Sequence, residues 1–248
     1  MTRGASGTGD ALRPSLGLSL VVALVAASAL EGRSGAAVTQ EGGAPGDLVG
    51  TIAVTGPPGR PVPQGGSVVW IPGITVGGAG APAERAMVSR DKRFDPHVLA
   101  VPREATVSFP NADPIYHNVF SLSPGNAFDL GLYRKGAARS VVFRNPGLVR
   151  VYCNIHPDMT AYVVVVDGSA YAVTDGDGAY RIGAVPAGRH TVRVWNEVGG
   201  ETSTVIDFAA GRPAKWDLTL DGTRYRVLPH ANKHGKAYPP ATRDVDRY

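Results

Sequence analysis

The sequence predicts an all-β protein, because short runs of β-branched and aromatic residues alternate with clusters of turn-forming residues and helical periodicity is almost absent. The chain of 248 residues contains 32 glycines and 20 prolines. Turn clusters are clearest at positions 145–147, 175–178, 186–188 and 221–222. A chain of this length is sufficient for one or two β-domains of about 100 residues each.

The first 37 residues have the pattern of a secretory signal. Arg3 and Arg13 precede an apolar stretch from Leu16 to Leu30, and small residues follow as far as Ala37. The stretch is short and is interrupted by glycine and serine, so we expect cleavage and not a permanent membrane span. Segment 1–37 therefore predicts export to the periplasm or beyond the cell, with no integral membrane span after cleavage.

The remaining sequence predicts strands on both sides of one unusual loop. Residues 47–73 contain two strand-like runs, Gly50 to Val54 and Ser67 to Trp70, around a proline-bearing turn. The stretch 74–168 contains further strand-like runs at 98–101, 107–109, 118–122, 140–143, 148–152 and 161–166. The segment between the last two runs must then be the connection between two strands.

That connection holds the only cysteine of the chain. Cys153 is followed by His156 and then by Met159, each three residues further on. A helix does not explain this spacing, because positions three and six apart leave one helical face and Pro157 would break the hydrogen-bond ladder. Thiolate, imidazole and thioether suit a copper ion that alternates between its two oxidation states. The loop therefore predicts a copper site at the end of a sheet.

A second imidazole is available at His117, which opens the strand 118–122. The hairpin 140–152 separates it from Cys153, and in an antiparallel sandwich that path returns the chain to the same end. A lone cysteine or histidine is more often structural than metal-binding, but here spacing and residue types agree with one metal chemistry. His97 is a further candidate, either as an alternative ligand or as a supporting residue outside the ligand set.

Four motifs follow one another in this stretch: Phe94-Asp95-Pro96, Asn111-Ala112-Asp113, His117-Asn118-Val119 and the segment from Cys153 to Met159. Residues 91–168 thereby resemble the cupredoxins, small blue copper proteins of the amicyanin and plastocyanin type, and among them the exported methylamine-utilization type. The resemblance implies a Greek-key sandwich with one type 1 copper ion. It implies His117, Cys153 and His156 as equatorial ligands and Met159 as the axial ligand. It also implies that Asn118 ties the His117 loop to the backbone near the cysteine, and that electrons leave along the edge of His156.

The stretch 169–221 predicts a second β-domain together with residues 47–73. It contains a hairpin over 171–182, a Val-Pro-Ala-Gly turn at 185–188 and a strand from Thr191 to Trp195. These features resemble the carboxypeptidase regulatory-like domain, which is a transthyretin-like sandwich. The resemblance implies that the copper domain, residues 74–168, is inserted between the two halves, with glycines at both junctions.

Two further pairs of residues offer weaker metal sites. Asp175 and Asp177 have the spacing of calcium ligands, but no bidentate glutamate follows, so turn formation is the favoured interpretation. His230 and His234 lie in the tail 222–248, which we expect to be extended or partly disordered. A metal-scavenging role for these two histidines is left open.

These features predict an exported blue copper protein that carries single electrons between redox protein partners, such as a c-type cytochrome or an amine dehydrogenase. The alternative is a copper-binding or structural docking module of a cell-envelope complex with no electron-transfer role. We expect no enzyme, because six dispersed histidines do not supply a second, catalytic copper centre. A scattered net charge of +4 and an aromatic content of 7% indicate no nucleic-acid surface.

Overall fold

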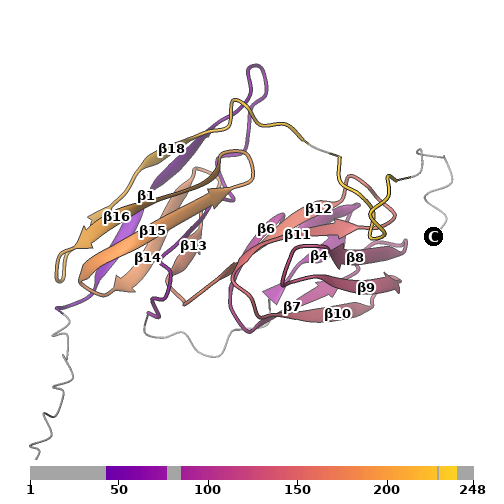
Figure 1. Cartoon of the computed structure of the whole chain (residues 1–248), viewed down its shortest axis with the longest axis horizontal. Coiled ribbons are helices and arrows are strands. Elements are labelled where there is room, and N and C mark those ends of the chain that lie inside the picture. The colour runs from indigo at the N-terminus through magenta and orange to yellow at the C-terminus, as the bar shows by residue number, and fades with distance from the viewer. Residues whose placement is uncertain (1–42, 77–84, 228, 239–248) are drawn as a thin grey trace, which may run out of the picture. The chain divides into compact units, whose positions relative to one another are not determined.

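The computed structural model describes residues 43–76, 85–227 and 229–238, and every regular element in these ranges is a β-strand (Figure 1). The all-β prediction is confirmed. The predicted signal at 1–37 lies outside the described residues. Across the described ranges, no helix is both long enough and apolar enough to cross a membrane.

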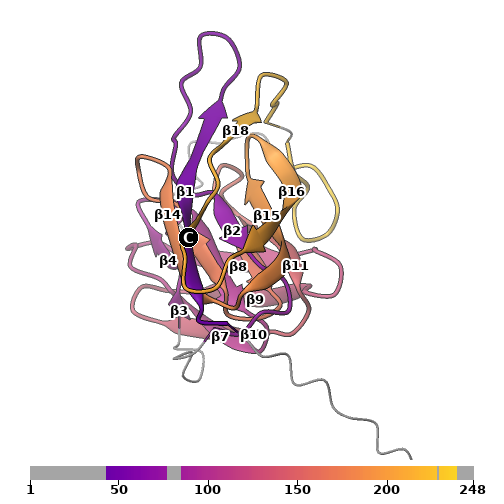
Figure 2. The same cartoon turned by 90° about the vertical axis from the view of Figure 1, so that its left-hand side faces the viewer.

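Two sheets built from the early and the late parts of the chain form what we call the discontinuous sandwich. One sheet has the order β14-β1-β17, with β18 also paired to β1, and the other has the order β13-β2-β15-β16. The strands are β1 (Gly46–Thr55), β2 (Val68–Trp70), β13 (Tyr171–Val173), β14 (Ala179–Val185), β15 (Gly188–Asn196), β16 (Gly200–Phe208), β17 (Ala214–Lys215) and β18 (Leu218–Asp221). Leu48 and Ile52 of β1 share a core with Val192 and Val194 of β15, so the two sheets pack face to face (Figure 2).

The residues between them form the central sandwich. Its sheets have the orders β10-β7-β3 and β6-β12-β11-β8-β9, and β4 and β5 form a separate hairpin. The strands are β3 (Arg85–Ala86), β4 (Val88–Arg90), β5 (Arg93–Asp95), β6 (Val98–Pro102), β7 (Ala105–Pro110), β8 (His117–Ser121), β9 (Phe128–Tyr133), β10 (Ala138–Phe143), β11 (Gly147–Cys153) and β12 (Thr160–Val166). Phe109, Phe143, Val151 and Val163 are fully buried between these sheets.

The chain leaves and re-enters the discontinuous sandwich at one place. Ile74 and Gly168 form an isolated β-bridge, and Gly73 donates a backbone hydrogen bond of 2.8 Å to Asp167. Gly168 has a φ of 104°, and a Cβ atom there would lie 2.3 Å from the Ile74 carbonyl oxygen, so a side chain does not fit. Among the described residues, the strands before residue 74 pair only with strands after 168, as expected of an inserted domain. The domain bounds and the transthyretin-like identification stay predictions.

Strand β12 is buried on both of its faces, which explains its unbroken apolar sequence. Ala161 and Val163 enter the core of the central sandwich. Val164 and Val166 point the other way and pack in a separate apolar cluster that includes Trp195. A strand buried on one face alternates apolar and polar residues, whereas one buried on both faces has no need to do so. This strand follows the candidate metal loop directly, so the loop is attached to a rigid element.

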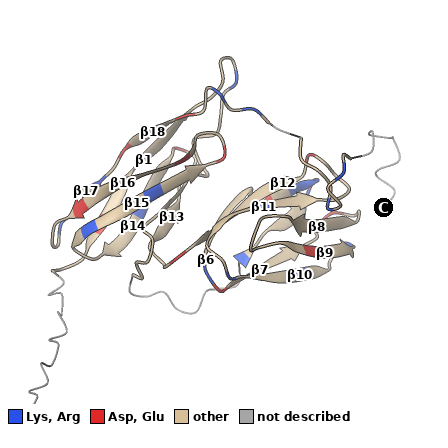
Figure 3. Cartoon of the chain, viewed as in Figure 1, with Lys and Arg blue, Asp and Glu red and all other residues tan. Residues whose placement is uncertain are grey.

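Charged side chains contribute little to holding these sheets together. Lysines and arginines are interspersed with acids along the strands and loops (Figure 3). The ion pair between Arg181 and Asp47, at 2.6 Å, is typical because its arginine side chain is 71% exposed. Exposed pairs of this kind contribute on the order of 0–1 kcal/mol. The stability of the fold therefore depends on its apolar cores.

We expect Phe109→Ala to lower the free energy of unfolding by about 3–5 kcal/mol, because the lost ring leaves a cavity between the two sheets. Urea denaturation of the metal-free full chain measures this loss. Val205→Ala on β16 is the control, since Val205 is 54% exposed, and it should change stability by less than about 0.5 kcal/mol. A loss below about 1 kcal/mol for Phe109→Ala would show that the sheets do not pack on this ring.

Candidate metal centre

The register of two neighbouring strands places the first two candidate ligands at the same end of a sheet. Strands β8 and β11 are antiparallel, with Cys153 opposite Val119 and Tyr152 opposite Phe120. His117 opens β8 and Cys153 closes β11, so both lie where the pairing ends. The sequence prediction that the intervening hairpin returns the chain to one end agrees with this register.

His117, Cys153 and His156 converge on one buried point. The Sγ atom of Cys153 lies 3.7 Å from Nδ1 of His117 and 3.5 Å from Nδ1 of His156. All three donor atoms lie within 4.8 Å of one another, and the two imidazole rings are 4.9 Å apart between centroids. Within the described ranges, this is the only group of three or more His, Cys, Asp or Glu side chains with metal-ligand spacing.

These separations fit a shared metal ion. At tetrahedral zinc sites, bonds of about 2.3 Å to sulfur and 2.05 Å to nitrogen place the two donors about 3.6 Å apart. The measured 3.5 and 3.7 Å lie on either side of that value. Thiolate with two imidazoles is also the donor set of copper electron-transfer sites. The spacing of the residues therefore fits one shared transition-metal ion, and their donor chemistry fits copper.

The loop between Cys153 and Met159 is closed by its own backbone. Met159 donates an N–H to the carbonyl of His156 at 3.1 Å, and Cys153 donates to the carbonyl of Met159 at 3.2 Å. Met159 is 1% exposed and belongs to the same apolar core as Cys153. The backbone of the loop therefore returns to the cysteine at Met159, and the role of Met159 as the axial ligand stays a prediction.

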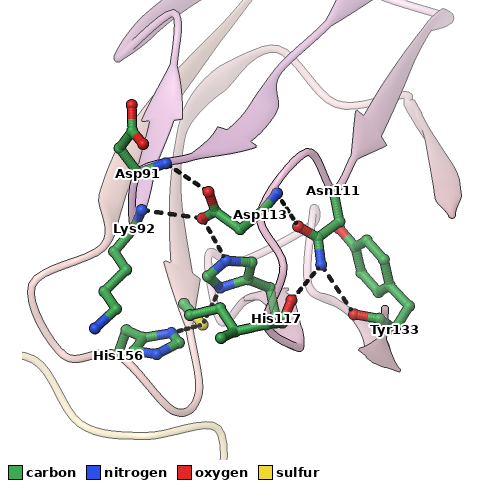
Figure 4. A network of polar contacts seen from close by, with 9 residues as sticks. Asp91, Lys92, Asn111, Asp113, His117, Tyr133 and His156 are labelled. Atoms are coloured by element: carbon green, nitrogen blue, oxygen red, sulfur yellow. Dashed lines mark hydrogen bonds and ion pairs between the residues drawn. The ribbon is translucent and has the colours of Figure 1, made fainter. Parts of the chain in front are cut away.

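A buried carboxylate fixes the orientation of the His117 ring. Asp113 Oδ2 lies 2.7 Å from Nε2 of His117, on the side of the ring away from Cys153 (Figure 4). The same carboxylate accepts backbone N–H groups of Asp91 and Lys92 at 2.6 and 3.0 Å (Figure 4). Burial by itself would raise the pKa of Asp113, but these hydrogen bonds together hold it below its usual value. Asp113 is therefore an anion that accepts a hydrogen bond from the Nε2–H group of His117.

The protonation of the cluster suits metal binding. Burial lowers the pKa of His117, and the hydrogen bond to Asp113 opposes that shift without reversing it. The ring is therefore neutral near neutral pH, with its Nδ1 lone pair directed toward Cys153. Burial also raises the pKa of the Cys153 thiol, more than nearby backbone N–H groups lower it. Metal binding here must accordingly release the thiol proton.

Asn118 connects the two ligand segments mainly through its backbone. Its carbonyl accepts the N–H of Asn154 at 3.0 Å, which joins the start of β8 to the cysteine loop. Its side-chain amide instead donates to Asp129 Oδ1 at 2.6 Å. The role of Asn118 as a supporting residue of the site stays a prediction. The Asp129 contact was not expected from the sequence.

The remaining candidate residues lie apart from the cluster. His97 binds Glu197 at 2.6 Å and packs its ring against Tyr162, so it is not brought to the three donors. Asp175 Oδ1 accepts the N–H groups of Asp177 and Ala179, which is turn formation.

The two tail histidines also lie outside the cluster. His230 contacts the outside of the cysteine loop, with Nε2 at 2.7 Å from the Pro157 carbonyl oxygen. His234 is exposed. Sequence reasoning missed Asp113 as a supporting residue, although its position four residues before His117 in the Asn111-Ala112-Asp113 turn was a usable signal.

No protein-family model matches the chain, and no curated protein matches it. Among solved structures, a purple cupredoxin from Nitrosopumilus maritimus is 22% identical, with 33% of this chain and 99% of that chain covered and a TM-score of 0.31. A reduced Cu(I) form of an amicyanin mutant is 24% identical, with 35% and 86% covered and a TM-score of 0.32. A copper-containing nitrite reductase from Thermus scotoductus SA-01 is 21% identical, with 47% and 28% covered and a TM-score of 0.34. Likenesses at this level do not establish a shared function.

We expect Asp113→Asn to weaken Cu²⁺ binding about 10-fold to 100-fold, because an amide holds the His117 ring and its tautomer less firmly than a carboxylate does. A competition titration against a chelator of known affinity measures the change. Asp207→Asn, an exposed position on β16, is the matched control and should leave the affinity unchanged. Equal affinities for all three proteins would mean that Asp113 does not support the site.

Proposed function

We propose that this chain is an exported type 1 copper protein that carries single electrons between periplasmic redox proteins. The observation that carries the proposal is the convergence of His117, Cys153 and His156 at one buried point. Copper, when bound, supplies a couple that gains and loses one electron, and this donor set serves both oxidation states. Met159 is proposed as the weak axial ligand.

The residues around the donors support a carrier because they hold the ligand geometry fixed. His117 is held by Asp113 on its far side, and Cys153 is held by the ladder between β8 and β11. The returning loop is closed by the hydrogen bonds of Met159. Donors that stay in place while the charge changes keep the cost of reorganisation small, which favours fast electron transfer.

The proposed exchange of electrons takes place at the edge of the cysteine loop. His156 is only 7% exposed, whereas Pro157 and Asp158, which follow it, are exposed. A redox partner that docks on this edge would come close to the imidazole without admitting water to the donors. By resemblance we propose a c-type cytochrome as acceptor and an amine dehydrogenase as donor. We propose no catalytic role, because four protein ligands leave no open position for a substrate.

A second candidate function is a copper-binding or structural docking module of a cell-envelope complex. The observation that favours it is the discontinuous sandwich, which contributes no residue to the cluster. A dedicated carrier needs only the central sandwich. Under this alternative, copper would be stored, delivered or structural, and the site would not exchange electrons with a partner.

A copper titration followed by visible absorption distinguishes the electron carrier from the docking module. For the carrier we expect saturation at one Cu²⁺ per chain, an intense blue or purple colour, and reversible bleaching by ascorbate. A colourless complex, or one that ascorbate does not reduce, would favour the docking module.

We expect Cys153→Ser to abolish the intense visible absorption, because that absorption is a charge transfer from thiolate sulfur to Cu²⁺ and a hydroxyl oxygen is too hard a donor to replace it. The measurement is a visible spectrum of the copper-treated variant beside the wild type. A far-ultraviolet circular dichroism spectrum of the metal-free variant controls for folding. A folded variant that keeps the colour would remove Cys153 from the ligand set.

We expect Met159→Leu to retain copper and to raise the reduction potential, because loss of a weak axial donor disfavours Cu²⁺ more than Cu⁺. Protein-film voltammetry measures the potential. Met87→Leu is the matched control, since Met87 is fully buried in the same core but lies outside the ligand loop, and its potential should stay at the wild-type value. A potential that moves equally in both variants would show a packing effect and no axial role.

A further inference from the structure

The segment from residue 229 to 238 runs along the outside of the cysteine loop. The Tyr238 hydroxyl donates to the carbonyl of Cys153 at 2.8 Å. His230 Nε2 lies 2.7 Å from the carbonyl of Pro157, and Lys233 donates its N–H to the Asn154 side chain at 3.0 Å. The segment thus contacts the loop at its first residue and again near its last residue. We call residues 229–238 the clamp segment.

Ring contacts reinforce these hydrogen bonds. His230 stacks on Tyr152 with ring centroids 3.9 Å apart and an angle of 18° between the planes. Tyr238 packs its edge against His230 at 5.1 Å. The clamp segment therefore contacts both the strand residue before the cysteine and the cysteine itself.

The clamp segment also reaches the other ligand-bearing strand. Lys233 Nζ forms an ion pair with Asp129 at 2.7 Å. Asp129 in turn accepts the side-chain amide of Asn118, the neighbour of His117. One short segment is consequently connected to the chain on both sides of the donor cluster.

The clamp segment has a fixed shape of its own, although it contains no strand. Asn232 donates its N–H to the carbonyl of Lys236 at 2.8 Å, and Gly235 donates to the carbonyl of Asn232 at 2.9 Å. The Asn232 side chain accepts two more N–H groups, from His234 and Lys236. These bonds close a compact turn that holds the contacting side chains in position.

The contact between clamp segment and loop is local. A cavity of about 480 Å³ remains between them, lined on one side by Pro157, Asp158 and Thr160 and on the other by Pro229, His230 and Tyr238. The two segments are joined by a few hydrogen bonds and ring contacts and not by continuous packing. Removing single groups should therefore loosen the loop without disrupting the core of the central sandwich.

We propose that His230, Lys233 and Tyr238 are positioning residues of the metal centre, which hold the cysteine loop in donor geometry and slow the loss of bound metal. This inference rests on the proposed function and goes beyond it. Residues 154–158 lie between β11 and β12 and so belong to no strand. The position of His156 in this segment therefore depends on supporting contacts. The clamp segment supplies such contacts from a distant part of the chain.

The test compares the double variant His230→Ala/Tyr238→Phe with a matched control, His234→Ala/Tyr225→Phe, in the full chain. Tyr225 donates its hydroxyl to Glu197, and His234 is exposed, so the control removes the same groups away from the cysteine loop. The first readout is amide hydrogen exchange over residues 153–159 in the metal-free protein. The second is the rate at which loaded protein loses Cu⁺ to an excess of a Cu⁺ chelator.

We expect loop exchange and copper loss each to accelerate about fivefold to tenfold in the clamp variant, as for the loss of one or two hydrogen bonds, and neither to change in the control. Unchanged loop exchange would overturn the proposal. Faster exchange with unchanged copper loss would also overturn it, because the contacts would then only stabilise the fold. If the wild type binds no copper, the proposed function fails. The exchange readout alone then decides whether the clamp holds the loop.

Discussion

The antiparallel pairing of β8 with β11 is the constraint on which the metal centre depends. It sets Cys153 opposite Val119, so the histidine that opens one strand and the cysteine that closes the other meet at one edge of the sheet. Apolar side chains on the inner face of β11 hold that register, because a slip of one residue would turn Val149 and Val151 out of the core. The positions of His117 and Cys153 are thus a consequence of strand packing, whereas His156 lies on the loop that follows β11.

Three sets of contacts then limit how far each donor can move. Asp113 holds the His117 ring from behind, and the backbone bonds of Met159 close the loop that carries His156. The clamp segment holds the same loop from outside. These contacts come from separate parts of the chain, and two of the three sets act on the same loop. A centre supported in this way suits a metal whose charge changes while its ligands stay still.

Much of the metal centre could be predicted from the sequence, because three of its candidate donors lie on one short loop. The spacing of Cys153, His156 and Met159, with a proline between them, excluded a helix and indicated soft donors on one loop. What remained unpredictable depends on distant contacts. Asp113 is positioned by backbone N–H groups of Asp91 and Lys92, more than twenty residues earlier. The clamp segment lacks strand periodicity. The supporting role of Tyr238 and His230 depends on their contacts with the cysteine loop, which is 73 to 85 residues away in the sequence. The burial of β12 on both faces could not be predicted either, because its second face packs in a cluster with Trp195 of the discontinuous sandwich.

X-ray absorption at the copper K-edge of the loaded full chain tests the central claim most directly, because it measures which atoms surround the ion. We expect one short bond to sulfur and two bonds to imidazole nitrogen in both oxidation states, with bond lengths that change little on reduction. A spectrum with only nitrogen and oxygen neighbours would contradict it, since the ion would then lie away from Cys153.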